Sequence, residues 1–243
     1  MFVKSIRIAR KAMFPIFCFE KLTPQKQLKV GVVGTGFFIN SEGYLATVAH
    51  IFDRKSQNVT FKYWGILPDK VINPPLEIQE VARDNKNDIF IGKVDAKSPG
   101  FFLLCKKIPD VGRSVCVSGY PLAKITKNPQ GGAELGGVRR YFQPSFVLDK
   151  VKMNSKTNGV IRKHDGFLVR DVGLFGMSGG PVFDPDGIVV GIQASVTSPR
   201  ESKNAAGRKI VVENACVIRG NLIQSFLRKH KIRTPRSYPQ QVK

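Results

Sequence analysis

Acidic residues are scarce in this sequence. It has 18 Asp and Glu against 39 Lys and Arg, which leaves a formal net charge of +21 at pH 7. Such a surface attracts polyanions, but the basic residues are spread along the chain and no nucleic-acid-binding motif accompanies them. We therefore expect non-specific polyanion binding at the basic surface. A basic nucleic-acid-associated protein stays open as an alternative function.

Cysteine is also rare, and its spacing argues against two kinds of site. Cys18, Cys105, Cys116 and Cys216 stand singly in apolar runs, without a Cys-x-x-Cys pair or a histidine at metal-binding spacing. This pattern disfavours a zinc site and a disulfide framework, and favours buried thiols in a reducing compartment. We expect a cytoplasmic or otherwise intracellular protein.

Long hydrophobic runs are missing. No stretch of 18 or more apolar residues occurs, so no transmembrane segment is expected. Residues 1–12 are basic, and the apolar run that follows, residues 12–19, contains Pro15, which does not suit a secretion signal. We interpret this run as the first strand. A transit peptide or a membrane-touching arm stays open for residues 1–12.

The remaining composition favours strands joined by turns. Hydrophobic residues make up 42% of the 243 residues, and 23 glycines and 15 prolines accompany them. Many short strands separated by turns fit these numbers better than a helical bundle does, so the sequence predicts an all-β protein.

A serine stands among glycines in the second half of the chain. Residues 173–183 read Gly-Leu-Phe-Gly-Met-Ser-Gly-Gly-Pro-Val-Phe, and an apolar run follows at 188–192. Small neighbours let a substrate carbonyl approach Ser178, and backbone N–H groups can converge on one point there. A plain glycine-rich turn between two strands is the alternative for this segment taken alone.

A histidine and an aspartate occupy the ends of two earlier apolar runs. Residues 30–39 and 44–48 flank an Asn-Ser-Glu-Gly turn, which predicts a hairpin that delivers His50 at its far end. Asp88 directly precedes the run 89–94, where a carboxylate can hold one ring nitrogen of a histidine. Asp84 is the alternative, and we expect it to cap a turn.

These segments resemble those of the trypsin-like (chymotrypsin-fold) serine proteases, most closely the high-temperature-requirement (Deg) type without a PDZ domain. The resemblance lies in the Gly-x-Ser-Gly-Gly-Pro run, in the Gly-x-Gly-Phe…Thr-x-x-His hairpin and in a Gly-Tyr-Pro turn at 119–121. It implies two six-stranded antiparallel β-barrels with a C-terminal α-helix. The expected parts are a first barrel over 1–100, a second over 101–218, and a helix with a basic tail over 219–243.

The resemblance also implies the chemistry. Ser178 would attack the scissile carbonyl of a protein or peptide substrate, His50 would transfer the proton, and Asp88 would orient His50. The N–H groups of Gly176 and Ser178 would form the oxyanion hole. No metal or organic cofactor is implied, because the reaction is acyl transfer to water. A catalytically silent binding module with this fold is a second alternative function.

Substrate preference depends on fewer signals. By the same resemblance, Val172 lies at the base of the primary pocket, and the facing strand contributes Ala194, Ser195 and Val196. This lining predicts cleavage after apolar residues, whereas a one-residue slip would bring Asp171 into the pocket and favour a basic side chain. The oligomeric state is left open.

Four further segments are interpreted from local composition and spacing alone. Residues 122–137 and 149–160 are polar and predict loops, and Arg162–Gly166 predicts a turn, in which His164 has no expected role. Apolar residues at 222, 223, 226 and 227 repeat with helical spacing and predict the C-terminal helix.

Overall fold

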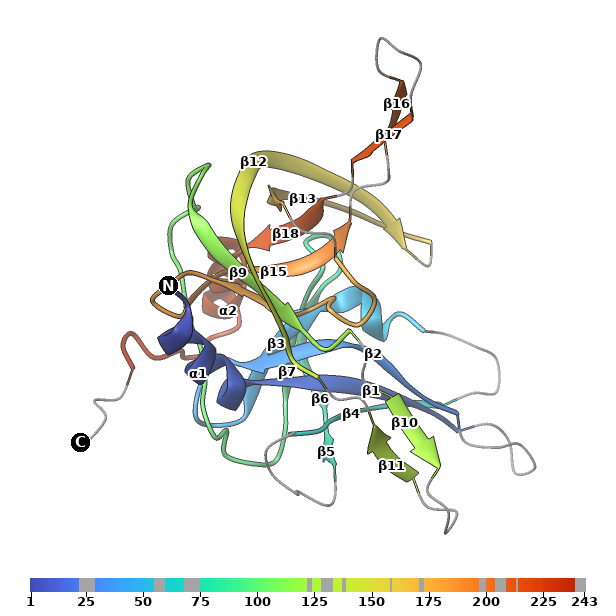
Figure 1. Cartoon of the computed structure of the whole chain (residues 1–243). Coiled ribbons are helices and arrows are strands. Elements are labelled where there is room, and N and C mark those ends of the chain that lie inside the picture. Colours follow the sequence, from blue (N-terminus) through green and yellow to red (C-terminus); the bar gives the residue numbers. More distant parts are fainter. Residues whose placement is uncertain are drawn as a thin grey trace.

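The computed structural model describes residues 1–21, 29–54, 60–67, 75–121, 124–127, 133–136, 139–157, 159–170, 173–196, 200–203, 209–212 and 214–238. Within these residues the chain forms two seven-stranded sheets, two separate hairpins and two α-helices (Figure 1). The predicted all-β fold with a C-terminal helix is confirmed.

The first sheet has the strand order β5-β4-β1-β2-β3-β7-β6, with every neighbouring pair antiparallel. Its strands are β1 (Met13–Lys21), β2 (Lys29–Phe38), β3 (Tyr44–Val48), β4 (Thr60–Gly65), β5 (Leu76–Glu77), β6 (Gln79–Asp84) and β7 (Ile89–Lys93). The predicted hairpin is present as β2 and β3, whose turn is fixed by the Asn40 side chain. Its Oδ1 accepts hydrogen bonds from the N–H groups of Glu42 and Tyr44.

The second sheet has the order β14-β9-β12-β13-β18-β15-β8, and an additional pairing of β14 with β15 closes part of it into a ring. Its strands are β8 (Leu103–Leu104), β9 (Ser114–Gly119), β12 (Tyr141–Thr157), β13 (Val160–Val169), β14 (Pro181–Phe183), β15 (Ile188–Val196) and β18 (Ala215–Arg219). Each sheet has one strand more than expected because a two-residue strand, β5 or β8, is added at one edge.

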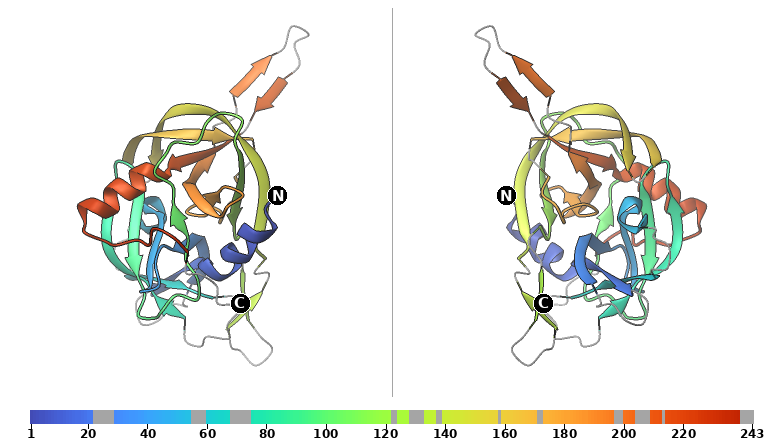
Figure 2. Two further views of the ribbon diagram at one scale, coloured as in Figure 1. Left: turned by 90° about the vertical axis from the view of Figure 1, so that its left-hand side faces the viewer. Right: turned by 90° about the vertical axis from the view of Figure 1, so that its right-hand side faces the viewer.

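Two polar segments that were predicted as loops contain strands. The 149–160 segment belongs to the long hairpin of β12 and β13, because Asp149 to Thr157 pair residue by residue with Val160 to Leu168. Within 122–137, β10 (Lys124–Lys127) pairs with β11 (Ala133–Gly136), and a further hairpin, β16 (Arg200–Lys203) with β17 (Lys209–Val212), projects away from the body (Figures 1 and 2). Cross-strand pairing here outweighs a local composition that is typical of loops.

A helix precedes β1, which the sequence analysis did not predict. α1 (Val3–Ala12) buries Ser5, Ala9 and Ala12 on one face, and the Phe2 ring meets Phe183 of β14 edge to face at 6.3 Å. The buried residues recur at helical spacing, which supplies the physical reason for the helix. Its basic residues are exposed, and Figure 2 shows α1 (blue) and α2 (Gly220–Lys229, red) at separate places on the surface.

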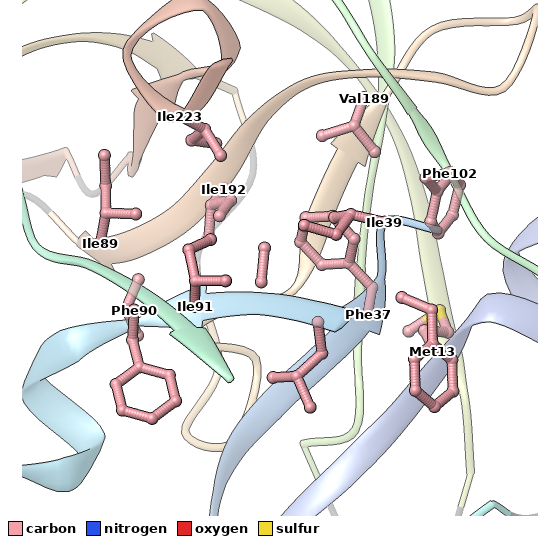
Figure 3. Close-up of a cluster of buried hydrophobic side chains, with 14 of the residues drawn as sticks. Met13, Phe37, Ile39, Ile89, Phe90, Ile91, Phe102, Val189, Ile192 and Ile223 are labelled. Carbon is pink, nitrogen blue, oxygen red and sulfur yellow. The ribbon is translucent and has the colours of Figure 1, made fainter. Parts of the chain in front are cut away.

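The main core lies between the two sheets. Phe102 lies between Phe37 of the first sheet and Phe183 of the second, with ring centroids 5.7 and 5.5 Å away. Figure 3 shows side chains from both sheets and from α2 meeting in this layer, among them Phe37, Ile39, Ile91, Val189, Ile192 and Ile223. Burial of this shared layer is what fixes one sheet against the other, and the candidate site lies where the two sheets meet.

The cysteines carry no disulfide in the described part of the chain. Cys18, Cys116 and Cys216 are buried, and Cys105 is partly exposed. Three of the four thiols are therefore buried as expected.

Candidate active site

His50 lies where β3 runs into the 3₁₀ turn η1 (Ala49–Phe52). Its main-chain N–H donates to Asp88 Oδ1 over 2.9 Å, and its ring Nδ1 lies 2.8 Å from Asp88 Oδ2. The Asp88 side chain is 4% exposed and the His50 side chain 18%. One buried carboxylate therefore holds both the backbone and the ring of a histidine that keeps access to solvent.

The two aspartates considered as the partner of His50 make different contacts. Asp84 caps the turn before β7, because its carboxylate accepts the main-chain N–H of Asn87 over 3.0 Å and the Asn87 side-chain amide over 2.6 Å. Asp88 has a φ of +58°, in the left-handed region that non-glycine residues seldom adopt. Its contacts with His50 hold the residue in this conformation.

Ser178 follows a tight turn that requires glycine. Met177 N–H donates to the Leu174 carbonyl over 3.0 Å, and Gly176, the third residue of the turn, has a φ of +92°, as a type II turn demands. Thr35 on β2 holds this turn from the other sheet, since its hydroxyl donates to the Gly176 carbonyl and its N–H to the Ser178 carbonyl, both over 2.8 Å. Within the described residues, the N–H groups of Gly176 and Ser178 donate to no other group.

Gly179 gives a test of how closely the two sheets meet at this turn. Its φ is +86°, and a Cβ built on it would overlap the Thr47 hydroxyl and the Thr35 carbonyl oxygen. We expect Gly179→Ala to lower the free energy of unfolding by about 2–5 kcal/mol, from backbone strain and overpacking together. Urea unfolding measures this change. Gly31→Ala is the control, because a Cβ there has no atom within 4 Å; equal stability loss in both variants would contradict the expected tight contact.

A cleft of about 380 Å³ brings the candidate residues together. It is lined by His50, Asp88, Ser155, His164, Gly173, Leu174, Phe175, Ser178, Gln193, Ala194, Ser195 and Val196. All but one of the residues predicted for the catalytic and substrate sites line this cleft or, in the case of Gly176, lie in the turn before Ser178. Val172, like Asp171, lies outside the described residues. Although Ser178 and His50 share this cleft, no hydrogen bond joins their side chains in the part of the chain described. Such bonds are often long before substrate binds.

Apolar side chains stand open at one rim of this cleft. Phe175 is 77% exposed, Leu174 41% and Val196 40%, whereas Ala194 is buried. Covering large apolar groups that are exposed to water beside Ser178 lowers the free energy, so a bound chain would be stabilised there. The cleft is therefore suited to an apolar partner at this rim.

The β12–β13 hairpin supplies two residues of the site that were not predicted: His164 lines the cleft, and Arg162 contacts Asp88. Residues 161–166 alternate between exposed and buried positions, so Arg162 and His164 face inward from a strand where a turn was expected. Arg162 is completely buried, and its Nε donates to Asp88 Oδ1 over 2.9 Å. Residues 161–166 read Ile-Arg-Lys-His-Asp-Gly and do not alternate between apolar and polar types, so the sequence carries no periodic signal of this strand.

His164 is buried and neither of its ring nitrogens has a hydrogen-bond partner within the described part of the chain. Burial lowers the pKa of His164 below its usual 6.5, and the negative charge of Asp88 opposes this shift only in part. His164 is therefore held in its neutral form by its surroundings.

This lowered pKa predicts acid sensitivity. Below about pH 6.5 the unfolded chain binds a proton at His164 that the folded chain does not, so stability falls as the pH decreases from there toward the folded-state pKa. We expect His164→Gln to flatten the pH dependence of the unfolding free energy between pH 7 and 5, by at most about 1.4 kcal/mol per pH unit. Chemical denaturation across this range measures the slope. His230→Gln at the exposed end of α2 should leave the slope unchanged; the same flattening there would show that His164 is not responsible.

Among the described residues, no three His, Cys, Asp or Glu side chains gather closely enough to hold a metal ion. Neither α-helix has the length and hydropathy needed to cross a bilayer.

Comparisons with known proteins identify the family. The trypsin-like peptidase domain family matches residues 34–192, which contain His50, Asp88 and Ser178. The chain belongs to this family, and its relatives are of the Deg (HtrA) type.

Two curated relatives extend the comparison. A probable periplasmic serine endoprotease, DegP-like, of Halomonas elongata is 28% identical over 175 residues, which cover 68% of this chain and 29% of that protein. The putative serine protease HhoB of Synechocystis sp. is 24% identical over 219 residues, 89% of this chain and 46% of the relative. The chain thus spans less than half the length of these relatives.

Solved structures agree on the fold. The active form of the Rv3671c protease from M. tuberculosis superposes with a TM-score of 0.65 at 18% identity, over 97% of this chain and 86% of that one. The HtrA-type protease AlgW, solved with a decapeptide, gives a TM-score of 0.69 at 16% identity, over 95% and 67% of the two chains.

Proposed function

We propose that this chain is a serine endopeptidase that hydrolyses peptide bonds through an acyl-enzyme. Ser178 Oγ attacks the scissile carbonyl, His50 takes its proton and returns it to the leaving amine, and Asp88 stabilises the cationic ring. The observation that carries the proposal is the 2.8 Å contact between His50 Nδ1 and Asp88 Oδ2 at the cleft that Ser178 lines. This contact leaves Nε2 as the ring nitrogen for proton transfer.

In this proposal the tetrahedral intermediate is stabilised by the N–H groups of Gly176 and Ser178. Two observations support the assignment. Both N–H groups lack an acceptor within the described residues. The Thr35 hydroxyl donates to the Gly176 carbonyl, and this bond fixes the orientation of the peptide group between Gly176 and Met177. Loss of one such donor typically lowers turnover by about 10²- to 10³-fold.

We further propose cleavage after apolar residues. The exposed Phe175 and Leu174 side chains and the apolar Ala194 and Val196 of β15 support this preference. Val172 is assigned to the base of the pocket by resemblance. Peptides that carry an apolar or a basic residue before the scissile bond would separate this preference from one set by the neighbouring aspartate.

Labelling with a fluorophosphonate probe tests the proposed function. An activated serine reacts with the probe at neutral pH, so we expect one adduct, which mass spectrometry should locate on Ser178. The His50→Ala variant and urea-unfolded wild type should remain unlabelled, because the general base or its geometry is then missing. A folded wild type that never reacts, or an adduct on another serine, would overturn the proposal.

A further inference from the structure

The tip of the β12–β13 hairpin crosses from the second sheet to the first. Lys163 N–H donates over 3.1 Å to the carbonyl of Lys86, which lies in the turn that ends at Asp88. Arg162 and His164 project inward on either side of Lys163, whose own side chain is exposed. This strand therefore packs directly behind the proposed catalytic aspartate.

Asp88 receives a cation as well as a histidine. Its Oδ1 accepts both the His50 main-chain N–H and Arg162 Nε, each over 2.9 Å, while Oδ2 faces the His50 ring. The side chains of Arg162 and Asp88 are 1% and 4% exposed, so water screens this ion pair very little. The proposed mechanism does not require this arginine.

Arg162 continues into a chain of alternating charges. Its Nη2 pairs with Asp53, whose side chain is 7% exposed, and Asp53 also lies 3.5 Å from Arg83 on β6. Arg83 in turn pairs with Glu80 over 2.7 Å. The negative charge of Asp53 thus partly compensates the positive charge of Arg162 behind Asp88. Each charge in this chain changes the electrostatic potential at its neighbours.

We propose that Arg162 is a positioning residue that fixes the Asp88 carboxylate and tunes the basicity of His50. The proposal rests on the function proposed above. Arg162 shares Oδ1 with the His50 main chain, which leaves Oδ2 directed at Nδ1, and its charge opposes the formation of a cation on the His50 ring. Asp53 weakens this opposition by compensating Arg162.

This arrangement predicts that substitutions at Arg162 and at Asp53 shift the pH dependence of labelling in opposite directions. The quantity compared is the midpoint, the pH at which the labelling rate has fallen to half as the pH is lowered. Removing the guanidinium in Arg162→Met should raise this midpoint by roughly one pH unit. Removing the carboxylate charge in Asp53→Asn leaves Arg162 uncompensated, so it should shift the midpoint to lower pH. A general loss of packing would not produce two shifts of opposite sign.

The experiment measures the rate of fluorophosphonate labelling against pH for wild type, Arg162→Met, Arg162→Lys and Asp53→Asn. Above the midpoint, Arg162→Met should react about 10- to 100-fold more slowly because Asp88 is no longer held in place, and Arg162→Lys should recover part of the loss. Lys163→Ala, with its side chain in solvent, should match wild type. Since His164 is a second titratable ring that lines the same cleft, each variant is repeated with His164→Gln.

A second measurement separates the outcomes. The ring titration of His50, followed by NMR in Ser178→Ala, requires no hydrolytic activity. It should show the same opposite shifts in Arg162→Gln, which also removes the positive charge, and in Asp53→Asn relative to their parent, even where Arg162→Met fails to fold. A wild type that does not label refutes the proposed function, while the NMR shifts still test Arg162. Unchanged midpoints, or shifts of one sign, in a protein that labels would overturn the role of Arg162 alone.

Discussion

Ser178→Ala is expected to reduce peptide hydrolysis by about 10⁶-fold while the fold stays intact. The side-chain oxygen makes no hydrogen bond to the rest of the described protein, whereas the Ser178 carbonyl, which accepts from Thr35 N–H over 2.8 Å, is retained in alanine. Removal of the hydroxyl therefore eliminates the nucleophile and leaves the contact between the sheets in place. Steady-state rates on an apolar peptide substrate and thermal unfolding measure the two effects.

The matched control for this change is Ser225→Ala on the exposed side of α2. It should retain the wild-type rate and melting temperature. A Ser178→Ala enzyme that kept a substantial part of the wild-type rate would locate the nucleophile elsewhere. A large drop in melting temperature would instead show that the hydroxyl supports the fold.

Asp88→Asn is expected to lower turnover by about 10⁴-fold, for a reason that the contacts of this site make specific. The oxygen at the Oδ1 position accepts two donors, the His50 main-chain N–H and Arg162 Nε, so the asparagine carbonyl must take that place. The amide NH₂ then faces His50 Nδ1 and donates to it. His50 is left with its proton on Nε2 and cannot accept the Ser178 proton.

Asp84→Asn is the matched control, because among the described residues the Asp84 carboxylate accepts only from the nearby Asn87 in its turn. We expect this variant to stay within a few-fold of the wild-type rate, since its contacts do not reach the cleft. Peptide hydrolysis at neutral pH measures both variants. Equal losses at the two positions would show that the turn matters only as a structural element.

The β2–β3 hairpin and the serine turn, the glycine-containing turn at 174–177 that precedes Ser178, could be predicted because their sequence signals are local. An Asn-Ser-Glu-Gly turn between two apolar runs specifies β2 and β3, and glycine at 176 and 179 meets backbone angles that other residues resist. His50 and Ser178 follow directly from these turns. Their placement in one cleft depends on the packing of the two sheets, which the resemblance supplied.

Arg162 and His164 could not be predicted in the same way. A basic, glycine-containing segment is typical of an exposed turn, and its burial depends on partners far away in sequence, Asp88 and Asp53. A charged side chain is buried in a protein interior only when an oppositely charged or hydrogen-bonding partner is present there. α1 was missed for a related reason, because the face that it packs against is formed by residues near 183 and 187.

The bonds from Thr35 to the serine turn have a consequence for how the protein is made. They join residues more than 140 positions apart, and Arg162 adds a second link back to the first sheet. A chain emerging from the ribosome therefore holds its histidine and aspartate long before the turn that presents its serine can be anchored. By the proposed mechanism, each new molecule gains hydrolytic activity only after both halves have been synthesised and have docked.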